Sequence, residues 1–403
     1  MSPAPFLRLA LLSSTIFAFG AYAQAQNNSS MTVEGTNGTS LTATPLETFD
    51  GAWAMTFLPD GRALVTEQDG DLWLLGTDGA KLGEIGNIPE VEKRGQGGLG
   101  DIILHPDFAE NSTVFISYVE RDEADDSLSG AVVEKATLSL TEDGGNLNER
   151  NRIWEQSQKV PGNGHYSHRL AVAPDGNLII TSGERQKFSP SQNMQMNLGK
   201  IIRITTDGEP LEDNPFYGNG DVADTVWSLG HRNMLGVAFD ADGQLWAHEM
   251  GPKGGDELNR FVKGENYGYP YVSNGEHYNG KQFPGNHEDN PVYENPAISW
   301  TPVISPAGLI IYDGETFADW QGDAFIGGLS SKALIRVEFE QTPLDNQGSG
   351  GTSSTMETTA NEAERYEWGK RIREVEQGPD GAIYVLEDDD GGRLIKLTPA
   401  DES

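Results

Sequence analysis

Cysteine is absent from this chain of 403 residues, so no disulfide supports its fold. Basic residues are also scarce: 28 Lys and Arg stand against 62 Asp and Glu, which gives a formal net charge of −34. Because phosphate and anionic lipid recognition need clustered Lys and Arg, this balance argues against nucleic acid and membrane-surface partners. Two explanations of the acidity stay open: solubility in a salty environment, or carboxylates that serve Ca²⁺, which prefers oxygen ligands.

Long apolar runs are missing except at the N-terminus. Residues 9–21 form an apolar run that follows Arg8 and is too short to span a membrane. Ala21-Tyr22-Ala23 then fits a small-x-small cleavage site, so residues 1–23 are predicted to be a signal peptide. We therefore expect a protein without membrane insertion, located in a bacterial periplasm or secreted. Residues 24–44, rich in Asn, Ser, Thr and Gly, are predicted to form a flexible leader.

The chain also lacks amphipathic helical patterns longer than two or three turns, and a short turn-and-strand phrase recurs instead. Asp-Gly makes a tight hairpin turn because Gly accepts positive φ and Asp bonds its own backbone. The apolar run that follows each turn is typical of a buried strand. The phrase occurs at Asp60-Gly61, Asp175-Gly176, Asp242-Gly243 and Asp380-Gly381.

Two looser copies, at Asp107 and Asp323, bring the repeat to six units, about sixty residues apart. Units of four strands that repeat in this way predict an all-β fold, a six-bladed β-propeller over residues 45–400. Two packed β-sandwiches with similar hairpins are the alternative. Residues 347–359 are predicted to be a long surface loop, because a strand pattern resumes directly after them. In a propeller the loops of all blades meet around one axial funnel, where residues distant in sequence can converge.

Several loop residues could carry chemistry in such a funnel. His165 lies in a Gly-rich loop before a buried strand, which suits a general base, and His168 competes for that role. Arg232-Asn233 pairs a cation with an amide, which suits a planar, oxygen-rich ligand; a surface arginine in a turn is the alternative.

Oxygen donors follow closely along the chain. Gly251 and Pro252 can offer consecutive backbone carbonyls to Ca²⁺, and Asp256 and Glu257 can add carboxylate oxygens. No EF-hand pattern accompanies them, so the motif alone is weak.

Three cations near the C-terminus complete the set. Lys332 follows a Gly-Gly-Leu-Ser-Ser loop, and Arg371 and Arg373 point to the same face of a predicted strand. Two adjacent guanidinium groups repel each other and need an anion, which a polycarboxylate ligand would supply. Ion pairs with Glu367 and Glu374 are the alternative.

Together these motifs resemble the soluble aldose sugar dehydrogenases that depend on pyrroloquinoline quinone (PQQ), the glucose/sorbosone dehydrogenase family. The resemblance extends over residues 46–398. Its motifs are Gly95-Gln96-Gly97-Gly98-Leu99-Gly100, His105-Pro106-Asp107-Phe108, His165, Gly230-His231-Arg232-Asn233, Met250-Gly251-Pro252, Gly255-Asp256-Glu257, Asn266-Tyr267-Gly268-Tyr269-Pro270 and Arg371-Ile372-Arg373. The family implies a six-bladed propeller with PQQ and Ca²⁺ in its funnel.

The resemblance also implies residue roles. His165 would take the proton of the anomeric hydroxyl, while Arg232 and Asn233 would contact the quinone oxygens. The residues implied to hold the cofactor, mainly by its carboxylates, are Gln96, Lys332, Arg371 and Arg373. The oxygens implied to bind Ca²⁺ are the carbonyls of Gly251 and Pro252 at a catalytic site, and Glu257 with the carbonyl of Tyr267 at a second, structural site.

The implied reaction is oxidation of the C1 hydroxyl of an aldose to an aldonolactone, with hydride passing to PQQ and electrons leaving for an external acceptor. Two departures favour the broader aldose branch over strict glucose dehydrogenases. Gly164 stands where the glucose branch has an acidic residue, and Val303 stands where it has Thr, with Ser305 nearby as a replacement. A Ca²⁺-dependent gluconolactonase-like hydrolase and a non-catalytic binding propeller are the alternative functions.

Overall fold

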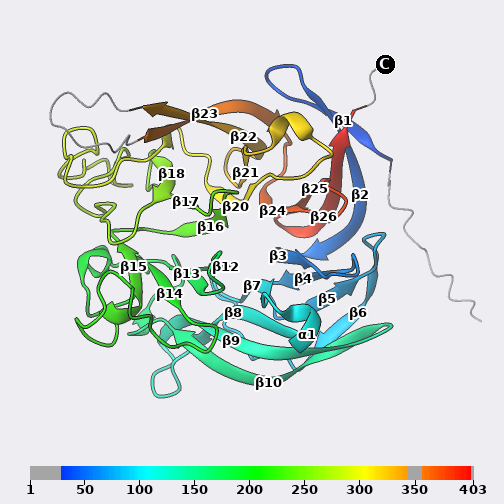
Figure 1. Cartoon of the computed structure of the whole chain (residues 1–403), viewed down its shortest axis with the longest axis horizontal. Coiled ribbons are helices and arrows are strands. Elements are labelled where there is room, and N and C mark those ends of the chain that lie inside the picture. Colours follow the sequence, from blue (N-terminus) through cyan, green and yellow to red (C-terminus); the bar gives the residue numbers. More distant parts are fainter. Residues whose placement is uncertain (1–28, 344–355, 401–403) are drawn as a thin grey trace, which may run out of the picture.

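A computed structural model describes residues 29–343 and 356–400, and in Figure 1 their sheets surround a central axis. The predicted signal peptide, residues 1–23, lies outside the described residues. The first three blades are β3–β6 (Ala52–Phe57, Ala63–Glu67, Leu72–Leu75, Lys81–Gly86), β7–β10 (Leu99–Leu104, Thr113–Arg121, Leu128–Thr141, Gly144–Glu155) and β12–β15 (Ser167–Val172, Leu178–Ser182, Lys200–Ile204, Val226–Leu229). The fourth and fifth are β16–β19 (Met234–Phe239, Leu245–Glu249, Asp256–Phe261, Ile298–Trp300) and β20–β23 (Pro306–Ile311, Ala324–Gly328, Ala333–Pro343, Met356–Glu367).

The sixth blade joins the two ends of the chain. It contains β24–β26 (Ile372–Gln377, Ile383–Glu387, Asp390–Pro399) and, on the outside, β2 (Ser40–Asp50), which pairs antiparallel with β26. A further strand, β1 (Met31–Glu34), pairs with β2, and the short β11 (Val160–Pro161) pairs with β9. This closure confirms the six-bladed propeller and rules out two sandwiches.

The closing strands also correct one expectation. The predicted flexible leader, residues 24–44, becomes β1 and the first part of β2 from residue 31 onward. Its composition is that of a linker, but Val33, Leu41 and Ala43 alternate with polar residues and are buried against the last two blades. Most of the predicted loop over residues 347–359 lies outside the described residues, but its last four residues are strand and not loop: they begin β23, which pairs with β22.

The predicted turns all fall in the same place of their blades, between the innermost strand and the second. In the first blade the N–H of Leu58 donates to the carbonyl of Arg62 (2.8 Å), and Gly61 has a φ of 85° that favours glycine. The innermost strands β3, β7, β12, β16, β20 and β24 contact one another in a ring around the axis (Figure 1). Because these turns lie on one face, the loops that enter the innermost strands lie on the other, which we call the funnel face.

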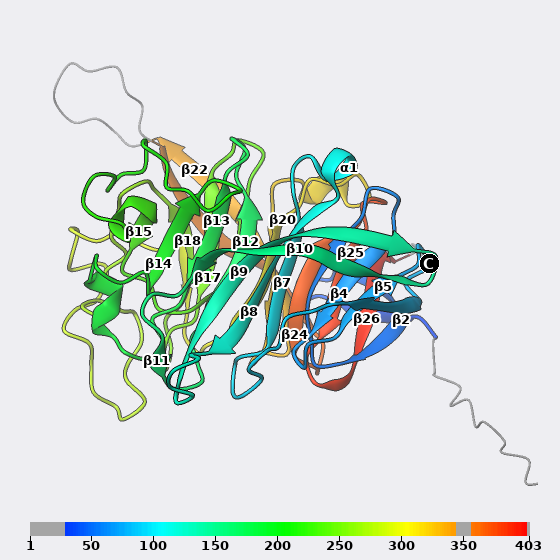
Figure 2. The ribbon, with the colours of Figure 1, turned by 90° about the horizontal axis from the view of Figure 1, so that it is seen from below.

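Helices are minor within residues 29–343 and 356–400. The one α-helix of that part is α1 (Phe108–Asn111), and the 3₁₀ turns are η1 (Ser189–Gln192), η2 (Ala223–Thr225) and η3 (Ala318–Trp320). No helix in the described ranges is long and apolar enough to cross a membrane. Figure 2 shows the molecule from the side, with β7, β8 and β9 steeply inclined and the outer strand β10 closer to horizontal.

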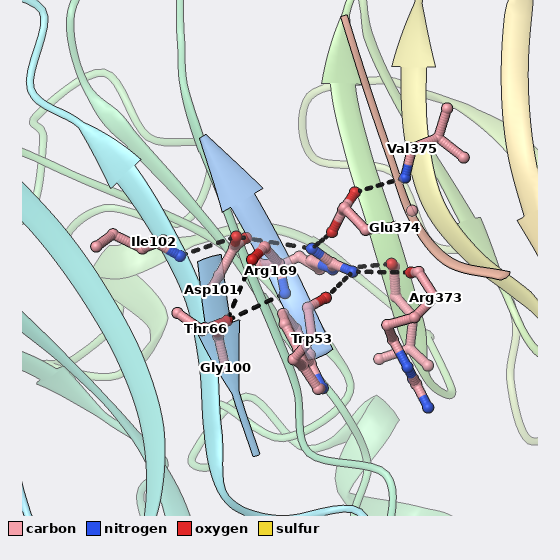
Figure 3. A network of polar contacts seen from close by, with 12 residues as sticks. Trp53, Thr66, Gly100, Asp101, Ile102, Arg169, Arg373, Glu374 and Val375 are labelled. Carbon is pink, nitrogen blue, oxygen red and sulfur yellow. Dashed lines mark hydrogen bonds and ion pairs between the residues drawn. The ribbon is translucent and has the colours of Figure 1, made fainter. Parts of the chain in front are cut away.

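A buried charge network ties three innermost strands together at the axis (Figure 3). Arg169 of β12 pairs with Glu374 of β24 and approaches Asp101 of β7, with 3.6 Å between Nη1 and Oδ1. The guanidinium also lies over the Trp53 ring, 4.0 Å from its centroid. Burial raises the pKa of Glu374 to about 7, although Arg169 opposes the rise.

Glu376, two residues further along β24, gives a prediction on pH and stability. Burial raises its pKa well above the usual value, and the charges of Glu374 and Asp101 raise it further. A carboxyl whose pKa is raised in the folded state binds more protons there than in the unfolded chain, so its contribution to stability falls as the pH rises. We expect Glu376→Gln to increase the melting temperature more at pH 8 than at pH 5, measured by differential scanning calorimetry. An equal change at both pH values would contradict this.

Candidate functional site

A cavity of about 620 Å³ opens on the funnel face. Its wall includes predicted residues from two blade entries: Gln96, in the loop before β7, and Arg371 and Arg373, at the start of β24. Other wall residues that carry polar or aromatic groups are Trp53, Gln68, Lys93, Tyr166, Ser167, His168, Asp388, Asp389 and Asp390. Lys93, which the sequence analysis did not single out, adds a cation and pairs with Asp69.

His165 lies beside this wall, in the loop that enters β12, and is 7% exposed. Its backbone N–H donates to Oε1 of Gln96 (2.6 Å), and its Nδ1 lies 2.5 Å from Oε1 of Glu184. Among the described residues, Nε2 makes no hydrogen bond. Burial lowers the pKa of His165, and the charge of Arg232 lowers it further, while Glu184 opposes both. The imidazole is thus neutral near pH 7, with Nε2 available to accept a proton.

Glu184 is the main residue that sequence reasoning missed. Burial disfavours its charged form, but the hydrogen bond and charge of His165 and the N–H of Phe188 outweigh burial, and the net pKa is lowered. The sequence repeat did contain a signal for this glutamate. Glu67, Glu249 and Glu387 each stand seven residues after the Asp of their turn, whereas the third unit has its glutamate two positions later, at 184. The carboxylate of Glu184 therefore gives His165 the acidic neighbour that is missing at position 164.

His168 is a poor competitor as a base. It is buried, its ring stacks on Trp53 with 4.9 Å between centroids, and Nδ1 lies 2.9 Å from Oγ of Ser117. Burial lowers its pKa to about 3, so the ring stays neutral and serves packing.

Arg232 and Asn233 are held at the entry of β16, and both are buried, which excludes a surface arginine in a turn. The backbone N–H of Arg232 donates to Glu249 (2.7 Å), and its Nη1 donates to the carbonyls of Met250 (2.7 Å) and Gly251 (3.1 Å). Its buried Nε has no hydrogen-bond partner in the part of the chain that the structure describes. A buried donor without a partner is costly, so this atom suits a ligand acceptor.

Arg371 and Arg373 share one carboxylate. Nε of Arg371 lies 2.6 Å from Oδ2 of Asp388, and Nη2 of Arg373 lies 3.0 Å from Oδ1. The alternative partners were therefore wrong: Glu374 pairs with Arg169, and within the described ranges Glu367 contacts neither arginine. Asp389 and Asp390 also line the cavity, so its three cations, Lys93, Arg371 and Arg373, stand against three carboxylates.

Three predicted cofactor residues do not belong to the described lining of the 620 Å³ cavity: Arg232, Asn233 and Lys332. Lys332 stands before β22 on the funnel face and is exposed.

The predicted Ca²⁺ residues gather in a second, very small cavity. Gly251, Pro252, Glu257 and Tyr267 line a space of about 10 Å³ together with Arg232. Oε1 of Glu257 lies 3.3 Å from Nε2 of His287. No cluster of three or more Asp, Glu or His that would hold a metal exists within 29–343 and 356–400. Glu249 also lines this space, so two carboxylate residues border it.

Asp256 has a different role from the expected one. Its Oδ1 accepts the N–H of Gly251 (2.7 Å), and its Oδ2 accepts those of Ile304 (2.8 Å) and Ser305 (2.6 Å). The carboxylate thus joins the β17–β18 loop to the β19–β20 loop and is occupied as a structural acceptor.

Comparison with known proteins agrees with this geometry. Residues 49–396 match the family model described as glucose/sorbosone dehydrogenase. The aldose sugar dehydrogenase YliI of Escherichia coli is 33% identical over 87% of this chain and 90% of its own. The apo crystal structure of an E. coli soluble aldose sugar dehydrogenase superposes with a TM-score of 0.80 at 32% identity, over 89% of this chain and all of that one.

One structural neighbour carries a cofactor. The PQQ-bound aldose sugar dehydrogenase of Streptomyces coelicolor has a TM-score of 0.67 and 25% identity, over 89% of this chain and 98% of that one. Because the family consists of dehydrogenases, membership argues against a hydrolase and against a non-catalytic binding propeller. The chain belongs to the glucose/sorbosone dehydrogenase family and is a sugar oxidoreductase.

Proposed function

We propose that this enzyme oxidises the C1 hydroxyl of aldose sugars to aldonolactones, using PQQ and Ca²⁺ in the funnel and an external electron acceptor. The observation that carries the proposal is the His165–Glu184 pair beside a cavity whose wall carries Arg371 and Arg373. A neutral imidazole with one nitrogen held and the other free is the arrangement of an oriented general base.

The cavity wall fits a flat tricarboxylate. Arg371 and Arg373 provide guanidinium donors for its carboxylates, and Gln96 provides an amide. The unpartnered Nε of Arg232 supports a role for Arg232 and Asn233 at the quinone oxygens. Lys332 is proposed to reach a carboxylate of the cofactor from the rim. Bound PQQ would supply the two-electron acceptor for the hydride of C1.

The oxygen donors fit Ca²⁺, a hard cation. The carbonyls of Gly251 and Pro252 are proposed for a catalytic ion, and Glu257 with the carbonyl of Tyr267 for a structural one. The carbonyl of Gly251 accepts from Arg232, and a carbonyl oxygen has a second lone pair for an ion. Arg232 and the ion would together polarise the electron-accepting end of the site.

The protein's own residues accept the proton of the C1 hydroxyl in the proposed reaction. Nε2 of His165 removes the proton of the C1 hydroxyl as the hydride leaves that carbon, so the sugar loses one proton and one hydride, two electrons and two protons in all. Glu184, bonded to Nδ1, stabilises the imidazolium that forms. Gln96 fixes the loop by accepting the His165 N–H.

Glu184→Gln tests the role of the pair. The glutamate raises the pKa of His165, so its neutralisation should lower that pKa further and move the acidic limb of the pH profile of kcat/KM to lower pH. The base also becomes weaker and the imidazolium loses its counter-charge, so kcat should fall by about 10- to 100-fold. Glu155→Gln, on the outer strand β10, is the control. An unshifted limb would contradict the pairing.

Reconstitution tests the function as a whole. Purified protein is mixed with PQQ and Ca²⁺, and reduction of a dye is followed after addition of glucose. Dye reduction that needs both PQQ and sugar supports the proposal. Opening of gluconolactone without dye reduction would favour a hydrolase and overturn it.

A further inference from the structure

A buried cation follows directly after the carboxylate that holds the proposed base. Arg185 is 1% exposed, and none of the described carboxylates forms an ion pair with it. Burial lowers its pKa to about 10, so the guanidinium is charged at neutral pH. A buried charge without a counter-charge is costly. Its contribution must therefore come from the groups that the guanidinium binds.

Those groups are backbone carbonyls of the loop that carries His165. Nε of Arg185 donates to the carbonyl of Gly164 (2.9 Å), and Nη2 donates to that of Gly162 (2.5 Å). Nη1 donates to the carbonyl of Ser129 in β9 (2.5 Å). One rigid fork of donors therefore ties the residue before the base to a strand of the neighbouring blade.

The same guanidinium holds the residue that follows the base. It lies over the ring of Tyr166, 3.7 Å from the centroid. The Tyr166 hydroxyl lies 2.7 Å from Oγ of Ser129 and donates to the carbonyl of Gly162 (3.2 Å). Arg185 thus contacts the chain on both sides of His165.

The backbone that Arg185 holds is strained. The φ of His165 is 53°, and those of Ser167 and His168 are 60° and 59°. Residues with a side chain rarely adopt this left-handed region, and such conformations persist only where the surrounding structure enforces them. The N–H of Arg185 also donates to the carbonyl of His165 (3.2 Å), so its backbone and its side chain both enforce the conformation.

We propose that Arg185 is a positioning residue for the oxidation, which holds the main chain around His165 while Glu184 holds the imidazole. The inference rests on the proposed function and adds a residue to it. Arg185 is not part of the described lining of the 620 Å³ cavity, so it acts through His165 and not on the sugar. A base that shifts by about 1 Å loses its alignment with the C1 hydroxyl, which can lower the rate about 10²-fold.

Arg185→Lys keeps the charge but loses the planar fork of donors. With the PQQ- and Ca²⁺-loaded enzyme and glucose, we expect kcat per bound PQQ to fall about 10²-fold while KM changes little. Arg203→Lys is the matched control and should keep the parent's kcat. Arg203 is buried in the same blade, but it pairs with Asp175 and Asp213 away from the funnel.

The pH profile separates positioning from a loss of folded enzyme, which would scale the profile without moving it. Burial lowers the pKa of His165, the charges of Arg232 and Arg185 lower it further, and Glu184 raises it. The acidic limb of kcat/KM should therefore move to higher pH in Arg185→Met and stay in place in Arg185→Lys. An unmoved limb in Arg185→Met would contradict a charged Arg185 next to the base.

Hydrogen exchange of the protein without cofactor tests the positioning independently of activity. Peptides that cover residues 160–168 should exchange faster in Arg185→Lys than in the parent, and at the parent's rate in Arg203→Lys. Faster exchange supports the positioning role even if the loaded parent oxidises no sugar, a result that would overturn the proposed function alone. Exchange at the parent's rate, or a kcat equal to the parent's in Arg185→Lys, would overturn the positioning role and leave the proposed function standing.

Discussion

His165→Gln lowers kcat for glucose oxidation by about 10² to 10⁴, the range expected when a general base is lost. Gln keeps a similar size and the backbone N–H that donates to Gln96, but its side chain cannot accept and carry the proton. Steady-state dye reduction with saturating PQQ and Ca²⁺ measures the effect. Because Arg371 and Arg373 are untouched, the affinity for PQQ should stay within a few-fold of the parent.

A second histidine provides the control for this result. His105 lies in the turn of the second blade, on the face opposite to the funnel, where its Nδ1 contacts Asn111. His105→Gln should retain the activity of the parent. Near-normal turnover in His165→Gln would contradict the assignment of the base and with it the role of Glu184.

Arg169→Met destabilises the fold by about 3–5 kcal/mol, the usual cost of removing one partner from a buried ion pair. Methionine keeps most of the apolar stem, but Glu374 loses its cation, and the carbonyl of Leu235 loses a donor at 3.0 Å. Because Asp101 and Glu374 come from two other blades, their repulsion acts on the ring closure itself. The free energy of unfolding in urea measures the change.

Two further variants distinguish the effect of the uncompensated charge from the effect of lost side-chain volume. Adding Glu374→Gln to Arg169→Met removes a buried uncompensated charge and should recover part of the loss. Arg152→Met deletes an exposed arginine that pairs with Glu120 (2.7 Å), and such pairs contribute about 1 kcal/mol or less. Equal losses in Arg152→Met and Arg169→Met would contradict the account of the axial network.

Most of the fold could be predicted because its signals are local. An Asp-Gly turn and the strand after it are specified within about ten residues, and six copies suffice to indicate a closed ring. The closing strand was not predictable in this way. Residues 31–44 resemble a linker in composition, and only pairing with β26, more than 300 positions away, makes Leu41 and Ala43 core residues.

The same distinction between local signals and long-range contacts applies to the residues of the site. His165, Arg232, Arg371 and Arg373 stand out by residue type and loop context, and the structure brings them to one face. Their partners depend on distances across blades or loops: Glu184 for His165, and Asp388 for both Arg371 and Arg373. A carboxylate in an acidic chain with 62 Asp and Glu carries no local mark of its partner.

A single-turnover experiment tests the central claim most directly. The protein is loaded with one equivalent of PQQ and Ca²⁺ without dye or oxygen, glucose is added, and the absorbance of the bound cofactor is followed over time. We predict rapid conversion to the reduced spectrum in the parent and a conversion slower by about 10² or more in His165→Gln. A cofactor that binds yet stays oxidised in the parent, or is reduced equally fast in both proteins, would contradict it.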